Sequence, residues 1–148
     1  MKLLNEVESA WLAGVIDGEG SVYLGKHTSR RSVLCQIIIA NTNLAFIQKV
    51  YEITQCGIIK EYQPLGTKYG TLISRKKGLW NWRLSGMQNC ASLLKQILPF
   101  LIIKTSKAKQ IILFADFRKG KGHHHYGAYE KAIIKGDIMQ IEEIQRLL

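Results

Sequence analysis

Small residues recur at every fourth position through one segment of this chain, the stretch AWLAGVIDGEG. Ala10, Gly14 and Gly18 therefore share one face of a helix and leave that face almost without side chains. Glycine inside a helix costs about 1 kcal/mol relative to alanine, and close approach of a second backbone is the usual compensation. Because the chain has one helix of this kind, we expect the second backbone to be the same helix of a second copy. Packing against another helix of the same chain is the alternative that the glycines alone leave open.

The periodicity of apolar residues predicts the elements around this segment. The helix is expected to begin after Asn5, whose side chain can form a capping box with Glu8, and to run to about Asp17. Strands are expected over 21–24, 33–40, 57–62 and 79–84, and further helices over 44–53 (N-cap Asn41 or Thr42), 87–98 (N-cap Ser85) and 105–117. The order predicts an α+β fold, αββαββα. Its four antiparallel strands form one sheet that carries helices on one face and leaves the other face open.

The distribution of charge indicates the class of partner. The 148 residues include 21 Lys and Arg against 11 Asp and Glu, a net charge of +10. Residues 60–121 hold thirteen of the basic residues and two of the acidic ones, whereas residues 1–25 are net acidic. Clustered positive charge favours a polyanion, so we expect a nucleic acid.

Several other classes of protein are disfavoured. Cys35, Cys56 and Cys90 form no C-x-x-C pair, which argues against a zinc ribbon or a disulfide framework. The longest apolar run, 97–103, is far shorter than the ~20 residues needed to cross a bilayer. The amino terminus lacks the pattern of a signal peptide, so we expect an intracellular protein, in the cytoplasm of a prokaryote or in an organelle. Three histidines at 123–125 stand between glycines without acidic or cysteine neighbours, which predicts a basic loop rather than a zinc site.

Glu19 stands out because it is an acid between two glycines at the end of the glycine-rich helix. A bare carboxylate facing phosphates would be repelled, and a divalent cation would resolve that conflict. If two copies pair through this helix, the two Glu19 carboxylates lie close together and form a hard-oxygen site that suits Mg²⁺. A solvent-facing glutamate beyond a helix end is the alternative that the spacing leaves open.

Residues 12–20, LAGVIDGEG, resemble the signature of the LAGLIDADG homing endonucleases. The matching letters are Leu12, Ala13, Gly14, Ile16, Asp17 and Gly20. The predicted order of elements is also similar, as is the later segment 99–104, PFLIIK. The resemblance covers roughly residues 5–118, and the single copy of the signature is similar to the homodimeric branch of the family.

This resemblance implies a single endonuclease domain over 1–148, with a core at 5–118 and a carboxyl-terminal helical extension at 119–148. It also implies a homodimer on double-stranded DNA, with a long pseudo-palindromic site, two or more Mg²⁺ ions per dimer and one cut in each strand. An intron- or intein-type homing endonuclease of this kind has no membrane partner and no small-molecule substrate. An RNA-binding intron maturase and a non-cleaving DNA-binding regulator of the same fold are the alternatives.

The resemblance also assigns roles to individual residues. Glu19 and the carbonyl of Gly18 would bind the metal, Asn41 would order the attacking water, and Lys104 would offset charge at the scissile phosphate. The dimer interface would include Ala10, Ala13, Gly14 and Asp17, with Asp17 in a structural role. The family often has a basic residue early in the second helix, where this chain has Leu44, Ala45 and Phe46.

Alternation along the predicted strands separates a core face from a DNA face. Ile37, Ile39, Trp80 and Trp82 have the parity of the core, and Trp11 belongs to the helix packing. The opposite parity and the loops supply the predicted DNA contacts: Tyr23, Lys26, His27, Arg30, Arg31, Gln36, Lys60, Tyr62, Arg75, Lys76, Asn81 and Arg83. Among them, Arg83 and Lys60 suit guanine, and Gln36 and Asn81 suit adenine.

Overall fold

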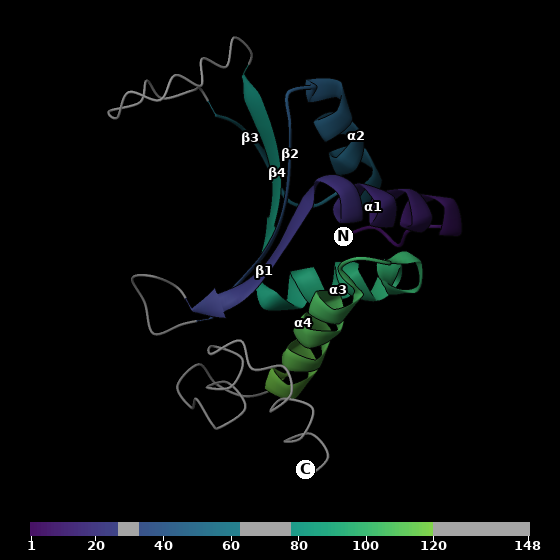
Figure 1. Ribbon diagram of the computed structural model, residues 1–148, viewed down its shortest axis with the longest axis vertical. Helices are drawn as coiled ribbons and strands as arrows, with labels where there is room; N and C mark the ends of the chain where they lie inside the picture. Colours follow the sequence, from purple (N-terminus) through teal and green to yellow (C-terminus); the bar gives the residue numbers. More distant parts are fainter. Residues whose placement is uncertain (27–32, 63–77, 120–148) are drawn as a thin grey trace.

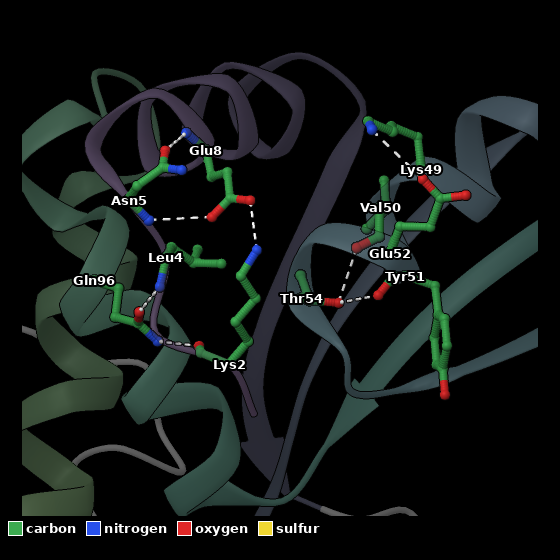
Figure 2. Close-up of polar contacts among 10 residues, drawn as sticks. All are labelled: Lys2, Leu4, Asn5, Glu8, Lys49, Val50, Tyr51, Glu52, Thr54 and Gln96. Atoms are coloured by element: carbon green, nitrogen blue, oxygen red, sulfur yellow. Dashed lines mark hydrogen bonds and ion pairs between the residues drawn. The ribbon is translucent and has the colours of Figure 1, made fainter.

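The first helix begins where the sequence predicts it. In the computed structural model, which describes residues 1–26, 33–62 and 78–119, α1 spans Glu6–Glu19. The side chain of Asn5 accepts a hydrogen bond from the Glu8 amide at 2.9 Å, and the Glu8 carboxylate accepts one from the Asn5 amide at 3.1 Å (Figure 2). The capping box is thus confirmed. The helix continues two residues beyond the predicted end, so Gly18 and Glu19 belong to its last turn.

Four antiparallel strands form one open sheet, which confirms the predicted α+β fold. The strands are β1 Gly20–Lys26, β2 Val33–Asn41, β3 Ile58–Tyr62 and β4 Leu79–Ser85, in the spatial order β1-β2-β4-β3. Gly20 begins β1 directly after α1, and a Cβ at this position would lie 2.7 Å from the Ile16 carbonyl oxygen. The direct passage from helix to strand therefore requires glycine here.

Helices cover one face of the sheet, and the other face is concave and open (Figure 1). The helices besides α1 are α2 Leu44–Thr54, α3 Met87–Ile97, the short 3-10 helix η1 Leu98–Phe100, and α4 Thr105–Arg118. Two predicted caps are wrong. Asn43 rather than Asn41 or Thr42 caps α2, because β2 continues through Asn41. Gly86, with φ of 97°, precedes α3 because Ser85 is still the last residue of β4.

The core lies between the sheet and the helices and has the predicted parity. Ile37, Ile39 and Trp82 are fully buried, and Ile39 lies opposite both Gly20 and Trp82. The Trp82 indole N–H donates to the Cys56 carbonyl at 2.8 Å. Gly57, with φ of 83°, lets the chain pass this ring, since a Cβ there would come within 2.6 Å of the indole nitrogen.

Several predictions fall on residues outside the described ranges. These are the histidines at 123–125 and the helix in the carboxyl-terminal extension. Within 1–26, 33–62 and 78–119, no helix is long and apolar enough to cross a membrane. Cys35, Cys56 and Cys90 are free thiols, as the sequence predicts.

Candidate nucleic-acid interface

Asp17 and Lys104 join the last turn of α1 to the start of α4. The Asp17 carboxylate accepts hydrogen bonds from the backbone amides of Ile102 at 2.7 Å, Ile103 at 3.2 Å and Lys104 at 2.9 Å. In return, the Lys104 ammonium donates to the Asp17 carbonyl at 2.7 Å. A cation at the carboxyl end of a helix also meets the negative end of the helix dipole. Two segments 87 residues apart in sequence are therefore fixed to each other.

The hydrogen bonds keep Asp17 ionised. Partial burial would raise the pKa of this carboxyl group, but the three backbone N–H donors and the nearby Lys104 ammonium outweigh burial and lower it below its ordinary value. The carboxylate oxygens of Asp17 are thus committed to the backbone at 102–104. This placement fits the predicted structural role.

Glu19 is exposed at the last position of α1, one residue before β1. In the described part of the chain, no group of three or more His, Cys, Asp or Glu residues gathers around it or elsewhere. With Asp17 committed, Glu19 is the carboxylate at this helix end that remains open to a ligand. Its oxygens, and the end-of-helix carbonyl of Gly18, are hard donors that suit Mg²⁺. Among the described residues Glu19 is therefore a single available carboxylate at this helix end, and Mg²⁺ in proteins is usually held by one or two carboxylates together with water and phosphate oxygens.

The small-residue face of α1 is exposed. A Cβ built on Gly14 or Gly18 meets nothing within 4 Å, and Ala10 is exposed as well. The described residues therefore contain no helix packed against these glycines. Val7, one turn before Ala10, is 79% exposed and extends the same face.

Ala13 does not lie on this face. Its side chain is fully buried in the core of its own chain, because it is one position away from Gly14 and about 100° around the helix. The predicted dimer contact of Ala13 is corrected on this ground: the side chain is not available to a second chain.

The open face of the sheet carries the six predicted strand residues that the structure describes fully. Tyr23 lies opposite Gln36, and Asn81 lies opposite Lys60. Tyr62 and Arg83 have the same parity and are joined by a hydrogen bond of 3.2 Å from the guanidinium to the phenol oxygen. The sequence missed Ile58, the partner of Arg83 across the strands, which is 52% exposed. Its parity with Lys60 and Tyr62 is the signal that could have identified it.

The structure does not place Asn41 on the open face. Asn41 has the parity of Ile39, and its amide oxygen accepts a hydrogen bond from the Asn43 amide at 2.8 Å in the turn before α2. Asn41 nevertheless lies at the same end of the sheet as the end of α1, because it is two residues beyond Ile39, which is paired with Gly20 at the start of β1.

The apolar start of α2 has a structural explanation. The Phe46 ring packs on the Trp11 ring with centroids 6.0 Å apart. This contact joins α2 to α1 and occupies the region where the family often has a basic residue. His27, Arg30, Arg31, Arg75 and Lys76, and the side chain of Lys26, lie outside the described part of the chain.

Comparison with known proteins finds similarity in structure rather than in sequence. No protein-family model matches the chain, and no curated protein matches it. The homing endonuclease I-CvuI, solved with the I-CreI target, is similar with a TM-score of 0.55 and 16% identity, and the match covers 94% of each chain. The LAGLIDADG meganuclease I-AabMI bound to DNA gives 0.56 and 18%, covering 90% of this chain and 42% of that one.

The chain has the fold of the LAGLIDADG homing endonucleases. A third structure, the LAGLIDADG homing endonuclease I-GzeII in complex with its DNA target, gives a TM-score of 0.57 with 13% identity over 96% of this chain and 44% of that one. The chain thus spans nearly all of I-CvuI and less than half of I-AabMI and I-GzeII. In the LAGLIDADG fold of this chain, the signature residues 12–20 include the last turn of α1 and both Asp17 and Glu19.

Proposed function

We propose that this protein is a Mg²⁺-dependent, site-specific DNA endonuclease of the homing type, which acts as a homodimer and hydrolyses one phosphodiester in each strand. The observation that carries the proposal is the arrangement at the end of α1. An exposed Glu19 follows the open small-residue face, and the ammonium of Lys104 is bound to the Asp17 carbonyl in the last turn of the same helix.

Two features of the described residues support a homodimer. The exposed face of Ala10, Gly14 and Gly18 lacks a partner within the described residues, and the acidic site has one available carboxylate. Pairing of two α1 helices about a two-fold axis would cover this face and bring a second Glu19 carboxylate to the site. The nearly full-length match to I-CvuI supports a chain that uses one copy of the fold per subunit.

Each residue at this site has a chemical task. Glu19 of each subunit, with the carbonyl of Gly18, would hold the divalent ions. Bound Mg²⁺ would lower the pKa of a water molecule and stabilise negative charge on the phosphate. Lys104 contributes a fixed positive charge for the same phosphate. Asn41 would orient water through its amide group, whose oxygen is engaged with the Asn43 amide.

The open sheet face and the net charge of +10 support a duplex DNA substrate. A twisted sheet edge or ribbon fits the wide major groove of B-form DNA, and each base pair presents a distinct pattern there. The homing endonuclease I-CvuI, solved with the I-CreI target in the presence of Mg and with its own target in the presence of Ca, points the same way.

Cleavage selection tests the proposal. The purified protein is incubated with a random duplex library in Mg²⁺, and cut molecules are sequenced. We expect one long, nearly palindromic site to be enriched, with no enrichment in chelator. Binding of one site without cleavage in Mg²⁺ would instead indicate a DNA-binding regulator. Preference for structured RNA over every duplex would indicate a maturase.

A further inference from the structure

Arg83 and Tyr62 form a clasp along the open face of the sheet. The guanidinium of Arg83 donates to the Tyr62 hydroxyl at 3.2 Å. Tyr62 lies opposite Leu79, whereas Arg83 lies opposite Ile58, which is four residues before Tyr62 on β3. At about 3.4 Å per residue, the two backbones are separated by about 14 Å along the strands. Both side chains must therefore lie along the sheet to meet, rather than point away from it.

The row that the clasp crosses contains Asn81 and Lys60, which are partners across β4 and β3. Among the described residues, the amide oxygen of Asn81 is a buried side-chain acceptor without a hydrogen-bond partner. A buried acceptor without a donor is unfavourable, because its hydrogen bonds to water have been lost and no protein hydrogen bond has replaced them. It lies on the face that is otherwise open, so a ligand that displaces the clasp could satisfy it.

We propose that the Arg83–Tyr62 clasp is the resting state of a base-reading pair, which opens when Arg83 leaves Tyr62 for a guanine and Asn81 is uncovered for an adenine. This inference rests on the proposed function and names the bases that part of the face reads. Arginine donates to guanine O6 and N7, and asparagine pairs with adenine N6 and N7 through its oxygen and nitrogen. The exocyclic amine of adenine is the donor that the orphaned oxygen lacks.

The spacing on β4 fixes how far apart the two bases lie. Arg83 and Asn81 are two residues apart on one strand, about 7 Å, and base pairs rise about 3.4 Å. The guanine and the adenine are therefore expected within about two base steps of each other in each half-site. Duplex RNA is disfavoured, because the major groove of an A-form helix is too deep and narrow for side chains of a sheet to read.

Removal of the Tyr62 hydroxyl tests the clasp. Opening costs the bond between Arg83 and Tyr62 in the free protein, so removal of the hydroxyl should favour the open state. Tyr62→Phe should raise affinity for the selected site several-fold and leave affinity for an unrelated duplex unchanged. Tyr51→Phe, at a tyrosine of similar exposure on α2, is the matched control and should change neither affinity.

The decisive measurement is a double-mutant cycle with Arg83→Gln, read as equilibrium binding of the selected duplex in chelator. Arg83→Gln should weaken binding of that duplex about tenfold or more and abolish the preference for guanine at one position of each half-site. In this background Tyr62→Phe should have no effect, because no clasp remains to be opened. Asn81→Ala should abolish the preference for adenine within two base steps of that guanine.

Two results would overturn the inference while leaving the endonuclease intact. One is weaker site binding by Tyr62→Phe, which would make the hydroxyl a direct DNA contact. The other is an equal effect of Tyr62→Phe with and without Arg83. If the wild-type protein binds no duplex in a salt-dependent way and cuts none, the proposed function fails first and this inference fails with it.

Discussion

Asp17 and Lys104 hold each other across 87 residues of sequence: the carboxylate of Asp17 accepts the amide of Lys104, and the ammonium of Lys104 donates to the carbonyl of Asp17. The pair fixes where α4 begins relative to where α1 ends. It also holds the ammonium group at the last turn of α1, the turn that contains Glu19. Asp17, which we do not assign to the metal, thus positions the Lys104 ammonium group.

Asp17→Asn should destabilise the fold. Asparagine keeps the shape of the side chain but replaces one acceptor oxygen with a donor group that faces backbone N–H donors. The free energy of unfolding should fall by about 2 kcal/mol, the range for hydrogen bonds to a charged group. Urea denaturation at pH 7 measures the loss. Asp116→Asn is the matched control, because its exposed pair with Lys95 should contribute less than about 1 kcal/mol.

Stability should depend on pH through the same carboxyl group. The folded protein lowers the pKa of Asp17, so its contribution is complete above the ordinary aspartate value of about 3.9 and is lost as the pH falls through the lowered value. The difference between the urea midpoints of wild type and Asp17→Asn, compared from pH 7 to pH 3, should begin to narrow below about pH 4. A constant difference over that range would show that the charge of Asp17 does not contribute.

Gly14→Leu should separate the dimer without unfolding the subunit. Apart from the backbone of its own helix, no described atom lies within 4 Å of a Cβ at this position, and leucine favours the helix by about 1 kcal/mol relative to glycine. Sedimentation should show a dimer for the wild type at micromolar concentration and a monomer for the variant. Gln48→Leu, at an exposed position of α2, controls for added apolar surface. A wild-type monomer at that concentration would contradict the dimer.

Much of the fold could be predicted because it depends on local patterns. The capping box of Asn5 and Glu8, the parity of Ile37, Ile39 and Trp82, and the order of elements are all written in short stretches of sequence. The exact start of α2 could not be predicted, because Asn41 and Asn43 are both good N-cap residues and the length of β2 decides between them.

The site could be predicted in part. The signature segment identified Glu19 as a candidate, and strand parity identified Arg83, Asn81 and Tyr62. Contacts between distant segments were beyond the sequence, because the Asp17–Lys104 pair and the Arg83–Tyr62 clasp depend on tertiary placement. The burial of Ala13 could not be predicted either, since helical spacing alone does not say which neighbouring position faces the core.

We propose that Glu19 holds the metal, and the variant Glu19→Gln tests this role. Glutamine keeps the size of the side chain and its capacity to form hydrogen bonds, but the dimer loses both acidic groups of the site. Lys104→Met is the companion variant, which should reduce cleavage while leaving metal affinity largely intact.

The measurement pairs nicking of the selected duplex in Mg²⁺ with binding of the same duplex in chelator. For Glu19→Gln we expect hydrolysis to fall by orders of magnitude while binding equals or exceeds that of the wild type, because less negative charge faces the phosphates. Cleavage by Glu19→Gln at the wild-type rate would contradict the placement of the active site, and joint loss of binding and cleavage would show that Glu19 holds the dimer rather than the metal.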